Sequence, residues 1–236
     1  MIEPIVLPNH EAMSQRAAEW IADAIRQRPD ALLCAASGST PNRAYELLAD
    51  KFAASPLHCA RLRLIKLDEW GGLPMDDPAT CESHLRRVLV EPLSLDDRYV
   101  SFASDGEPEA ECQRIAAWLR QHGPIDVCAL GLGLNGHLGF NEPHAFLRPH
   151  AHVAKLSDTS MTHAMLSQSS RRPTHGLTLG IADLLQSREV LLLVSGENKR
   201  AALARLLQGE IASQFPASFL QLHPAVTLLC DETALA

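Results

Sequence analysis

Short apolar runs alternate with helix-like segments along the chain, and this alternation constrains the fold more than any other feature. The strand-like runs occupy residues 31–36, 61–67, 125–133, 176–180, 189–196 and 225–231. Helical spacing of apolar residues marks the segments 11–28, 44–54, 80–91, 107–121 and 197–208. Apolar strands that are connected by helices build a mostly parallel sheet with helices on both faces. We therefore predict an α/β fold, a single three-layer Rossmann-like domain over residues 1–236.

The composition is that of a globular protein, and it argues against several functional classes. Of the 236 residues, 46% are hydrophobic and 21% are charged, which is close to the average for folded domains. The formal net charge of -7, the aromatic content of 5% and the lack of Lys/Arg runs argue against a nucleic-acid partner. No apolar run approaches the ~20 residues of a membrane helix, and residues 1–15 lack the pattern of a secretory signal. We expect a cytoplasmic protein without a nucleic-acid or membrane partner.

The six cysteines indicate buried thiols rather than a metal or redox centre. None of them forms a CxxC pair, and Cys34, Cys128 and Cys230 stand inside apolar runs. We expect small buried side chains in a reducing compartment. The histidines between residues 143 and 160 match no zinc-ligand spacing, so we expect no metal site.

Polar residues follow four of the predicted strands. Open α/β sheets bind ligands beyond the carboxyl ends of their strands, so residues at these ends are the first candidates for a site. They are Ser37-Gly38-Ser39-Thr40 after the first run, Asp68-Glu69 after the second, Asn135 to Glu142 after the third, and Lys199 after the run 189–196. We predict that these four groups converge at one rim of the sheet.

The first and last of these groups have features of a phosphate site. Gly38 lets the backbone approach a ligand, and the free N–H groups where Ser39 and Thr40 lead into a helix favour an anion. Lys199 stands in the first turn of a later helix, where the helix dipole disfavours a cation unless an anion is bound. The same residues also fit an ordinary helix cap and a solvated lysine. The chain has neither a P-loop nor a GxGxxG motif, which argues against a nucleotide.

The other two groups have the residue types of acid–base chemistry. If the chain is extended at Asp68 and Glu69, one carboxylate faces the cleft and the other anchors the loop. His137 and Glu142 lie five residues apart in a glycine-rich loop, and a histidine beside a carboxylate transfers protons near neutral pH. A surface carboxylate pair and a structural histidine are the alternatives.

Taken together, these segments resemble the glucosamine-6-phosphate deaminase/isomerase family over nearly the whole chain and in the same order. The most specific segments are Asp68-Glu69-Trp70 and Gly133-Leu134-Asn135-Gly136-His137-Leu138-Gly139-Phe140-Asn141-Glu142-Pro143. Ser37-Gly38-Ser39-Thr40-Pro41 and Leu220-Gln221-Leu222-His223-Pro224 fit the family too. The chain is most similar to the galactosamine-6-phosphate isomerase/deaminase branch, also in Lys66 to Trp70 and Pro216 to Leu220. The branch resemblance implies that galactosamine 6-phosphate is preferred over glucosamine 6-phosphate.

The resemblance implies an enzyme that acts on a 2-amino-2-deoxyhexose 6-phosphate. The sugar ring opens, the sugar isomerises and ammonia is lost, which leaves a ketohexose 6-phosphate, and no cofactor is required. By the same resemblance, Asp68 moves a proton between C2 and C1, His137 assists ring opening, and Glu142 is the partner of His137. Asn135 completes the catalytic loop. The implied contacts of the substrate and its phosphate are Ser37, Gly38, Ser39, Thr40, Glu69, Gly136 and Lys199.

Two positions depart from the family pattern. Asn135 replaces an aspartate, and an asparagine can hydrogen-bond but carries no charge to stabilise an imidazolium. The position of a phosphate-binding arginine falls between His163 and Met165, where the chain has no basic residue. Arg171 or Arg172 is the candidate replacement, unless the pair is a solvated charge run.

The sequence leaves two other functions open. A 6-phosphogluconolactonase-type hydrolase would use the same phosphate loop, with His137 as the base for attack of water on a lactone. A catalytically weak sugar-phosphate-binding protein would account for Asn135 and the missing arginine. The resemblance is compatible with a homo-oligomer, because family members include both hexamers and monomers. Residues 143–160 form the one long irregular segment, and we expect them to act as a mobile lid.

Overall fold

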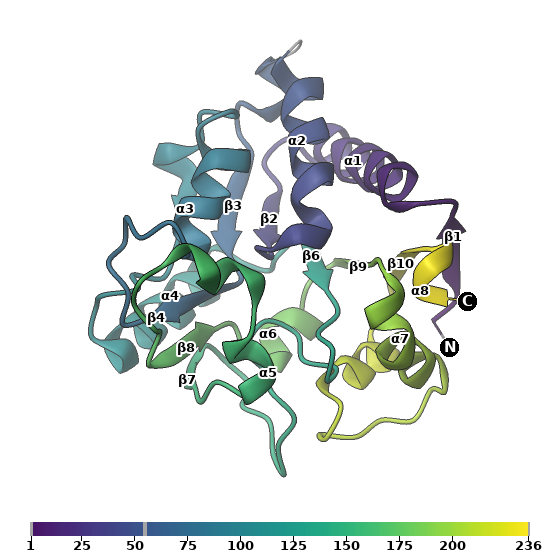
Figure 1. Ribbon diagram of the computed structural model, residues 1–236. Coiled ribbons are helices and arrows are strands. Elements are labelled where there is room, and N and C mark those ends of the chain that lie inside the picture. The colour runs from purple at the N-terminus through teal and green to yellow at the C-terminus, as the bar shows by residue number, and fades with distance from the viewer. Residues whose placement is uncertain (1, 54–55, 236) are drawn as a thin grey trace.

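A seven-stranded sheet forms the centre of the computed structural model, which describes residues 2–53 and 56–235 (Figure 1). The strands lie in the order β1-β10-β9-β6-β2-β3-β5, and all neighbours are parallel. Their bounds are β1 Pro4–Leu7, β2 Leu32–Ala35, β3 Arg63–Lys66, β5 Tyr99–Val100, β6 Val127–Gly131, β9 Glu189–Val194 and β10 Val226–Asp231. The predicted parallel sheet is confirmed, and β1 and β5, which the apolar pattern did not indicate, form its edges.

Helices connect the strands, as the apolar spacing predicts. The α-helices are α1 His10–Gln27, α2 Ser39–Ala53, α3 Cys81–Leu85, α4 Pro108–His122, α5 Asp158–Met161, α6 Ile181–Leu185, α7 Arg200–Leu207 and α8 Glu232–Leu235. Shorter turns are η1 Pro56–Cys59, η2 Arg86–Val90, η3 Asp96–Arg98, η4 Ala164–Gln168, η5 Glu197–Lys199 and η6 Pro216–Leu222. The predicted helix 80–91 is therefore α3 continued by η2, and the predicted helix 197–208 begins with η5.

Alternate residues of the central strands pack on opposite faces of the sheet. Leu33 and Ala35 of β2 join a cluster with α1 and α2, which lie together on one side of the strands in Figure 1. Leu32 and Cys34 join a second cluster with α4, α6 and α7. Side chains of a strand point alternately to the two faces, so a sheet that is covered on both sides needs apolar residues at nearly every position. This is why the sequence contains continuous apolar runs, and it confirms the three-layer architecture.

A second, antiparallel sheet accompanies the main one, and periodicity did not predict it. It has the order β4-β8-β7, with β4 at Asp68–Gly71, β8 at His175–Thr178 and β7 at His152–Ala154. The predicted strand 176–180 corresponds to β8 and joins this sheet instead of the parallel one. The segment 143–160, expected to be irregular, contains β7 and α5. Pairing between distant segments decides both features, and periodicity within one segment does not report such pairing.

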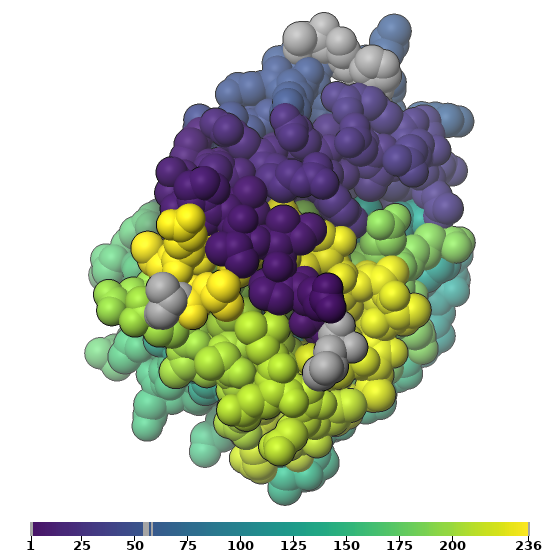
Figure 2. All heavy atoms as spheres, turned by 90° about the vertical axis from the view of Figure 1, so that its right-hand side faces the viewer, coloured from purple at the N-terminus to yellow at the C-terminus, as the bar shows by residue number. Residues whose placement is uncertain are grey.

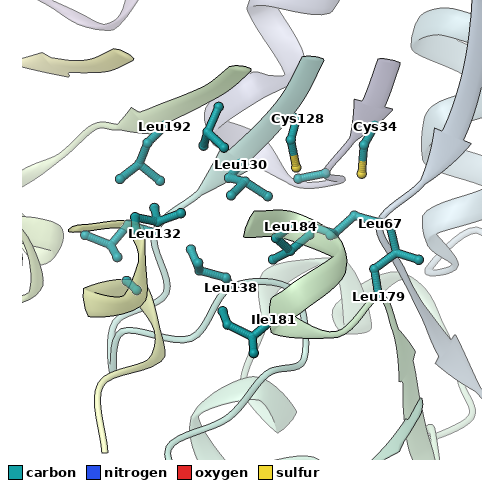
Figure 3. Close-up of a cluster of buried hydrophobic side chains, with 14 of the residues drawn as sticks. Cys34, Leu67, Cys128, Leu130, Leu132, Leu138, Leu179, Ile181, Leu184 and Leu192 are labelled. Atoms are coloured by element: carbon teal, nitrogen blue, oxygen red, sulfur yellow. The ribbon is translucent and has the colours of Figure 1, made fainter. Parts of the chain in front are cut away.

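The larger apolar cluster carries the residues that anchor the loops of the sheet (Figure 3). Cys34 and Cys128 lie on the neighbouring strands β2 and β6 and point to the same side. Leu138, from the loop after β6, points into the same cluster and is fully buried. All six cysteines are buried thiols, as predicted.

The first and last strands of the described chain lie side by side. β1 pairs in parallel with β10, with Pro4 opposite Leu228, and Figure 2 shows the N-terminal residues against the C-terminal ones. Among the helices of the described ranges, none has both the length and the apolar content needed to cross a bilayer.

Candidate active site

A cavity of about 310 Å³ is lined by residues that follow the carboxyl ends of β2, β3, β6 and β9. Residues 159–160 and 162–165, between β7 and β8, form another part of its wall. The predicted site residues that line it are Ser37, Gly38, Ser39, Thr40, Asp68, His137 and Lys199. Four strand ends thus converge on one site, as the sequence predicts. The cavity wall does not include Glu69, Asn135, Gly136 or Glu142.

One end of the cavity is suited to an anion. α2 begins at Ser39, directly after Gly38, whose φ of 119° lies in the region that glycine tolerates. The N–H groups of the first helical turn lack partners within the helix, and together with the helix dipole they favour negative charge. Lys199 lies at the N-cap of α7, and no ion pair to its ammonium group occurs in the described residues. Burial lowers the pKa of Lys199, which is consistent with a cation that lacks a carboxylate partner.

Asp68 and Glu69 occupy the first two positions of β4 and differ sharply in their surroundings. Asp68 is 9% exposed and lines the cavity, whereas Glu69 is fully buried away from it. The prediction that one carboxylate faces the cleft and the other holds the loop is confirmed. Burial and the charge of Glu69 raise the pKa of Asp68 to about 7, against the opposing effect of Lys66. A carboxyl group with this pKa exchanges protons near neutral pH.

Glu69 supports the wall behind Asp68 instead of contacting the cavity. Its Oε2 accepts hydrogen bonds from Nζ of Lys66 at 2.6 Å and from the N–H of Glu82 at 2.8 Å. Its Oε1 accepts the N–H of Cys81 at 2.9 Å. All of these partners are buried, so the carboxylate has no face left for a substrate. The expected substrate contact of Glu69 is replaced by a role in fixing the start of α3 against β4.

The loop after β6 positions His137 by close packing. A Cβ atom on Gly133 would lie 2.3 Å from Cδ2 of His137, so the imidazole ring requires glycine at this position. Leu138 anchors the loop in the core (Figure 3). A Cβ atom on Gly139 would lie 3.5 Å from Oδ2 of Asp68, so the same loop also packs against that carboxyl group. His137 and Asp68 therefore face one cavity from two different elements.

Glu142 lies behind His137 and is held by several side chains. Its Oε2 lies 3.4 Å from Nδ1 of His137 and accepts a hydrogen bond from Nδ2 of Asn135 at 2.9 Å. Its Oε1 accepts hydrogen bonds from the hydroxyl groups of Ser157 and Ser160. Burial acts to raise the pKa of Glu142, but His137, Ser160 and Asn135 outweigh it and lower the pKa to about 2. Glu142 is therefore a carboxylate that faces the inner nitrogen of the His137 ring.

Asn135 and Gly136 support the loop from outside the cavity. Oδ1 of Asn135 accepts the backbone N–H of His137 at 3.1 Å, while its amide group donates to Glu142. The negative charge beside His137 thus comes from Glu142, and an asparagine at position 135 leaves it in place. Gly136 has a φ of 84°, and a Cβ atom there would lie 2.1 Å from the ring of Phe215. The expected substrate contact of Gly136 is thereby corrected to a packing role.

The cavity also contains residues that the sequence patterns did not indicate. Trp70 packs against Phe140 at 4.5 Å and against His163 at 5.9 Å between ring centroids. The thiol of Cys81 accepts a hydrogen bond from Oγ of Ser37 at 2.9 Å and lies 3.9 Å from Oδ1 of Asp68. The position of Trp70 directly after Asp68-Glu69 was a usable signal. Cys81 and His163 reach the cavity only through folding, and no local pattern marks them.

The two arginines proposed to replace the missing phosphate-binding arginine lie elsewhere. Arg171 and Arg172 are exposed, and neither lines the cavity. The segment 163–165, in which the family pattern has the arginine, does line it. The expectation is corrected: Arg171 and Arg172 lie in the exposed connection between η4 and β8, and in this part of the chain the cavity wall ends at Met165.

The fold and the cavity together define a class of protein, namely an α/β enzyme whose cavity combines carboxyl and imidazole groups with an end that is suited to an anion. The chain belongs to the family of glucosamine-6-phosphate isomerases/6-phosphogluconolactonase, whose model matches residues 9–229. It is 43% identical over 216 residues to a protein of Escherichia coli (strain K12) named "Putative deaminase AgaI", covering 91% of this chain and 86% of that protein. It is 38% identical over 240 residues to the glucosamine-6-phosphate deaminase of Streptomyces coelicolor, and the match covers 99% of this chain and 91% of that protein.

A solved structure supports the same assignment. The structure of a monomeric glucosamine-6-phosphate deaminase matches this chain with a TM-score of 0.93 and 34% sequence identity. The match covers 99% of this chain and 98% of the other. The resemblance inferred from the sequence motifs is thereby confirmed at the level of the family.

Proposed function

We propose that this protein converts a 2-amino-2-deoxyhexose 6-phosphate to a ketohexose 6-phosphate and ammonia. The observation that carries the proposal is the convergence of three groups on one cavity. These are the Asp68 carboxyl group, the pair of His137 and Glu142, and the anion-binding end with Lys199. They match the three requirements of the reaction: proton transfer between carbon atoms, ring opening and phosphate binding. The relatives that are named deaminases support the same reaction.

Asp68 is the proposed base for the transfer between C2 and C1. In the open-chain sugar, the proton on C2 lies next to the C1 carbonyl group and can be removed by a carboxylate. A pKa of about 7 leaves a large fraction of Asp68 ionised at neutral pH and still allows the protonated acid to return the proton to C1. As this proton moves from C2 to C1, a proton from the ammonium group of the substrate passes to the C1 oxygen, and the product is an iminium at C2 with a C1 hydroxyl group. Water then adds to C2, the proton of the added hydroxyl group passes to nitrogen, and the C–N bond breaks to release ammonia and leave a C2 ketone.

His137 is the proposed acid–base group for ring opening. Opening of the ring requires a proton to leave the C1 hydroxyl group and a proton to reach the ring oxygen. An imidazole ring can carry out both transfers, and the Glu142 carboxylate lies 3.4 Å from Nδ1 of His137, so that Nε2 remains for the substrate. The hydrogen bonds from Asn135 and Ser157 support this role because they keep Glu142 oriented.

We further propose that galactosamine 6-phosphate is preferred over glucosamine 6-phosphate. The support is the similarity of residues 66–70 and 216–220 to the galactosamine branch. The first segment contributes Asp68 and Trp70 to the cavity wall. The second supports the His137 loop, because the N–H of Ala217 donates to the carbonyl oxygen of Gly136 at 2.8 Å. Both segments are therefore placed to influence how the sugar lies against the catalytic groups.

An assay of ammonia release with the two amino-sugar phosphates side by side tests the proposal. We expect turnover of both sugars, faster with galactosamine 6-phosphate, and a loss of turnover in Asp68→Asn. Asp50→Asn, an exposed position on α2, is the matched control and should behave like the wild type. Absence of ammonia release by the folded wild-type protein would overturn the deaminase reaction. Hydrolysis of 6-phosphogluconolactone in the same preparation would then favour the lactonase alternative.

A further inference from the structure

We propose that His163 is a phosphate-binding residue of this cavity, which donates a hydrogen bond from Nε2 to the anion held at residues 37–40 and Lys199. The inference rests on the proposed function, because it takes the ligand of the cavity to be a sugar phosphate. It adds a contact outside the strand ends, from the segment between β7 and β8.

The position of His163 brings it over the anion-binding end of the cavity. The residue lines the cavity together with Gly38 and Lys199. Nε2 of His163 is the nearest atom to the place where Gly38 would carry a Cβ, at a distance of 3.9 Å. Because Gly38 has no side chain, no atom of this residue stands between its backbone and Nε2 of His163. A phosphate oxygen that accepts N–H groups from the start of α2 would lie within reach of this nitrogen.

The hydrogen bonding of the ring determines what His163 can offer. Its side chain caps η4, with Nδ1 accepting the N–H of Met165 at 3.3 Å. A nitrogen that accepts this bond carries no proton, so in a neutral ring the proton is on Nε2. No group in the described ranges hydrogen-bonds to Nε2, which leaves a donor directed at the cavity. The ring is also supported by Trp70 at 5.9 Å between centroids, which restricts its movement.

The charges around His163 are consistent with this form of the ring. Burial, His137 and Lys199 lower the pKa of His163, which favours the neutral ring with a proton on Nε2. His163 also acts on His84 of α3, whose pKa is lowered to about 4 by burial and then by the charges of Arg87 and His163. A phosphate monoester carries nearly two negative charges at pH 7, and Lys199 supplies only one positive charge. A second strong donor at the same end of the cavity would complete its coordination.

The test measures inhibition of ammonia release by inorganic phosphate, together with KM and kcat for glucosamine 6-phosphate. His163→Asn keeps an acceptor near the position of Nδ1, so it preserves the η4 cap but does not reach the anion. His163→Gln places an amide donor near the position of Nε2. A hydrogen bond to a charged group predicts a rise of roughly tenfold or more in the phosphate inhibition constant and in KM for His163→Asn. His163→Gln should remain within about threefold of the wild type, because its amide replaces the Nε2 donor.

His144→Asn is the matched control. Nδ1 of His144 accepts the N–H of Phe146 at 3.4 Å, which is the same local arrangement, but His144 does not line the cavity. In this variant the phosphate inhibition constant and KM should both equal those of the wild type. Equal phosphate inhibition in His163→Asn and the wild type would overturn the inference, and so would equal weakening in the Asn and Gln variants. Direct calorimetric titration with inorganic phosphate separates this inference from the proposed reaction. If phosphate binding depends on His163 but no amino sugar is deaminated, only the proposed reaction fails.

Discussion

Two carboxylates of nearly the same chemistry stand next to each other at the start of β4, and their surroundings give them different roles. Glu69 meets the ammonium group of Lys66 and the N–H groups at the start of α3. Asp68 forms no ion pair within the described residues and is buried beside the charge of Glu69, so its pKa rises to about 7. The extended conformation of β4 is what separates the two side chains.

The raised pKa of Asp68 predicts how activity depends on pH. If Asp68 must be ionised to act as the base, kcat/KM should increase with pH up to about 7 and then level off on that side of the profile. Glu69→Gln removes the charge that raises this pKa, so the acid limb should move to lower pH. The pH–rate profiles of the wild type and of Glu69→Gln check the prediction. An acid limb that stays in place in the variant would contradict the assigned cause.

Ionisation of the Asp68 carboxyl group should make the fold less stable as pH rises. An aspartate with a folded pKa of about 7 and a reference pKa of 3.8 binds protons more tightly in the folded protein, so stability is lost between about pH 4 and pH 7. Asp68→Asn removes this penalty. We expect the free energy of unfolding of the variant to exceed that of the wild type by up to about 4 kcal/mol at pH 8 and by little at pH 4. Urea unfolding at the two pH values measures the difference, and an equal effect at both would show that ionisation of Asp68 is not responsible.

At the scale of elements, one buried lysine joins three parts of the fold around the site. Lys66 ends β3, and its Nζ donates to Glu69 on β4 at 2.6 Å and to Glu82 on α3 at 2.9 Å. The carbonyl oxygen of Phe102 accepts a third hydrogen bond at 2.9 Å. Burial acts to lower the pKa of Lys66, but the two carboxylates outweigh it and raise the pKa. The ammonium group is therefore charged, and it fixes the relative positions of β3, β4 and α3.

Removal of this lysine should destabilise the fold strongly. Lys66→Met leaves the carboxylates of Glu69 and Glu82 buried without their cation, and breaking a buried ion pair costs about 3–5 kcal/mol. Urea unfolding of the variant tests the expected loss. Arg26→Met is the matched control, because Arg26 forms an ion pair with Asp23 at the same distance of 2.6 Å on an exposed helix face. There the loss should be at most about 1 kcal/mol. Similar losses in the two variants would contradict the importance of burial.

The elements that sequence periodicity predicted well are those whose pattern is local. Asn9 accepts the N–H of Ala12, and this cap places the beginning of α1 within one residue of the prediction. Strand β4 was not predicted because Asp68, Glu69 and Gly71 are poor strand formers in isolation. It exists because β8 pairs with it, with Asp68 opposite Thr178. The strand that carries the proposed base is thus fixed by a partner more than a hundred residues away.

At the scale of the whole molecule, three apolar clusters support one another. Two of the clusters lie on the two faces of the main sheet. The third is at the second sheet and includes Trp70 of β4 and Ala154 of β7. The first two share the strands of the main sheet, since alternate residues of β2 and β6 belong to different clusters. We propose that the chain unfolds as a single cooperative domain.

The three tryptophans test this proposal, because each one reports on a different cluster. Trp118 packs against the cluster with α4, α6 and α7, Trp20 packs against the cluster with α1 and α2, and Trp70 belongs to the cluster at the second sheet. In variants that keep only one tryptophan, the others replaced by phenylalanine, urea unfolding should give coincident transitions after allowance for each variant's stability. Far-UV circular dichroism of the same sample provides the global reference. If Trp70 fluorescence changes at a clearly lower urea concentration than circular dichroism, the second sheet and the cavity wall unfold separately.

The pattern of amino acids alone predicts the main layers of this protein and the group of residues that meet in the site. Continuous apolar runs and helical spacing report burial directly, and the carboxyl ends of parallel strands must share one edge of a sheet. This is why the strand-end positions of Ser37, Asp68, His137 and Lys199 correctly predict that all four line one cavity.

The surroundings of each of these residues depend on tertiary contacts. Glu69 lies among buried partners, Asn135 donates a hydrogen bond to Glu142, and His163 lines the cavity from another part of the chain. These facts depend on contacts between segments far apart in the sequence, and on burial, which changes the energy of a charge. Local sequence patterns report neither the contacts between distant segments nor the burial of a charge. The residue types thus predict which chemistry is available, and folding decides which of them perform it.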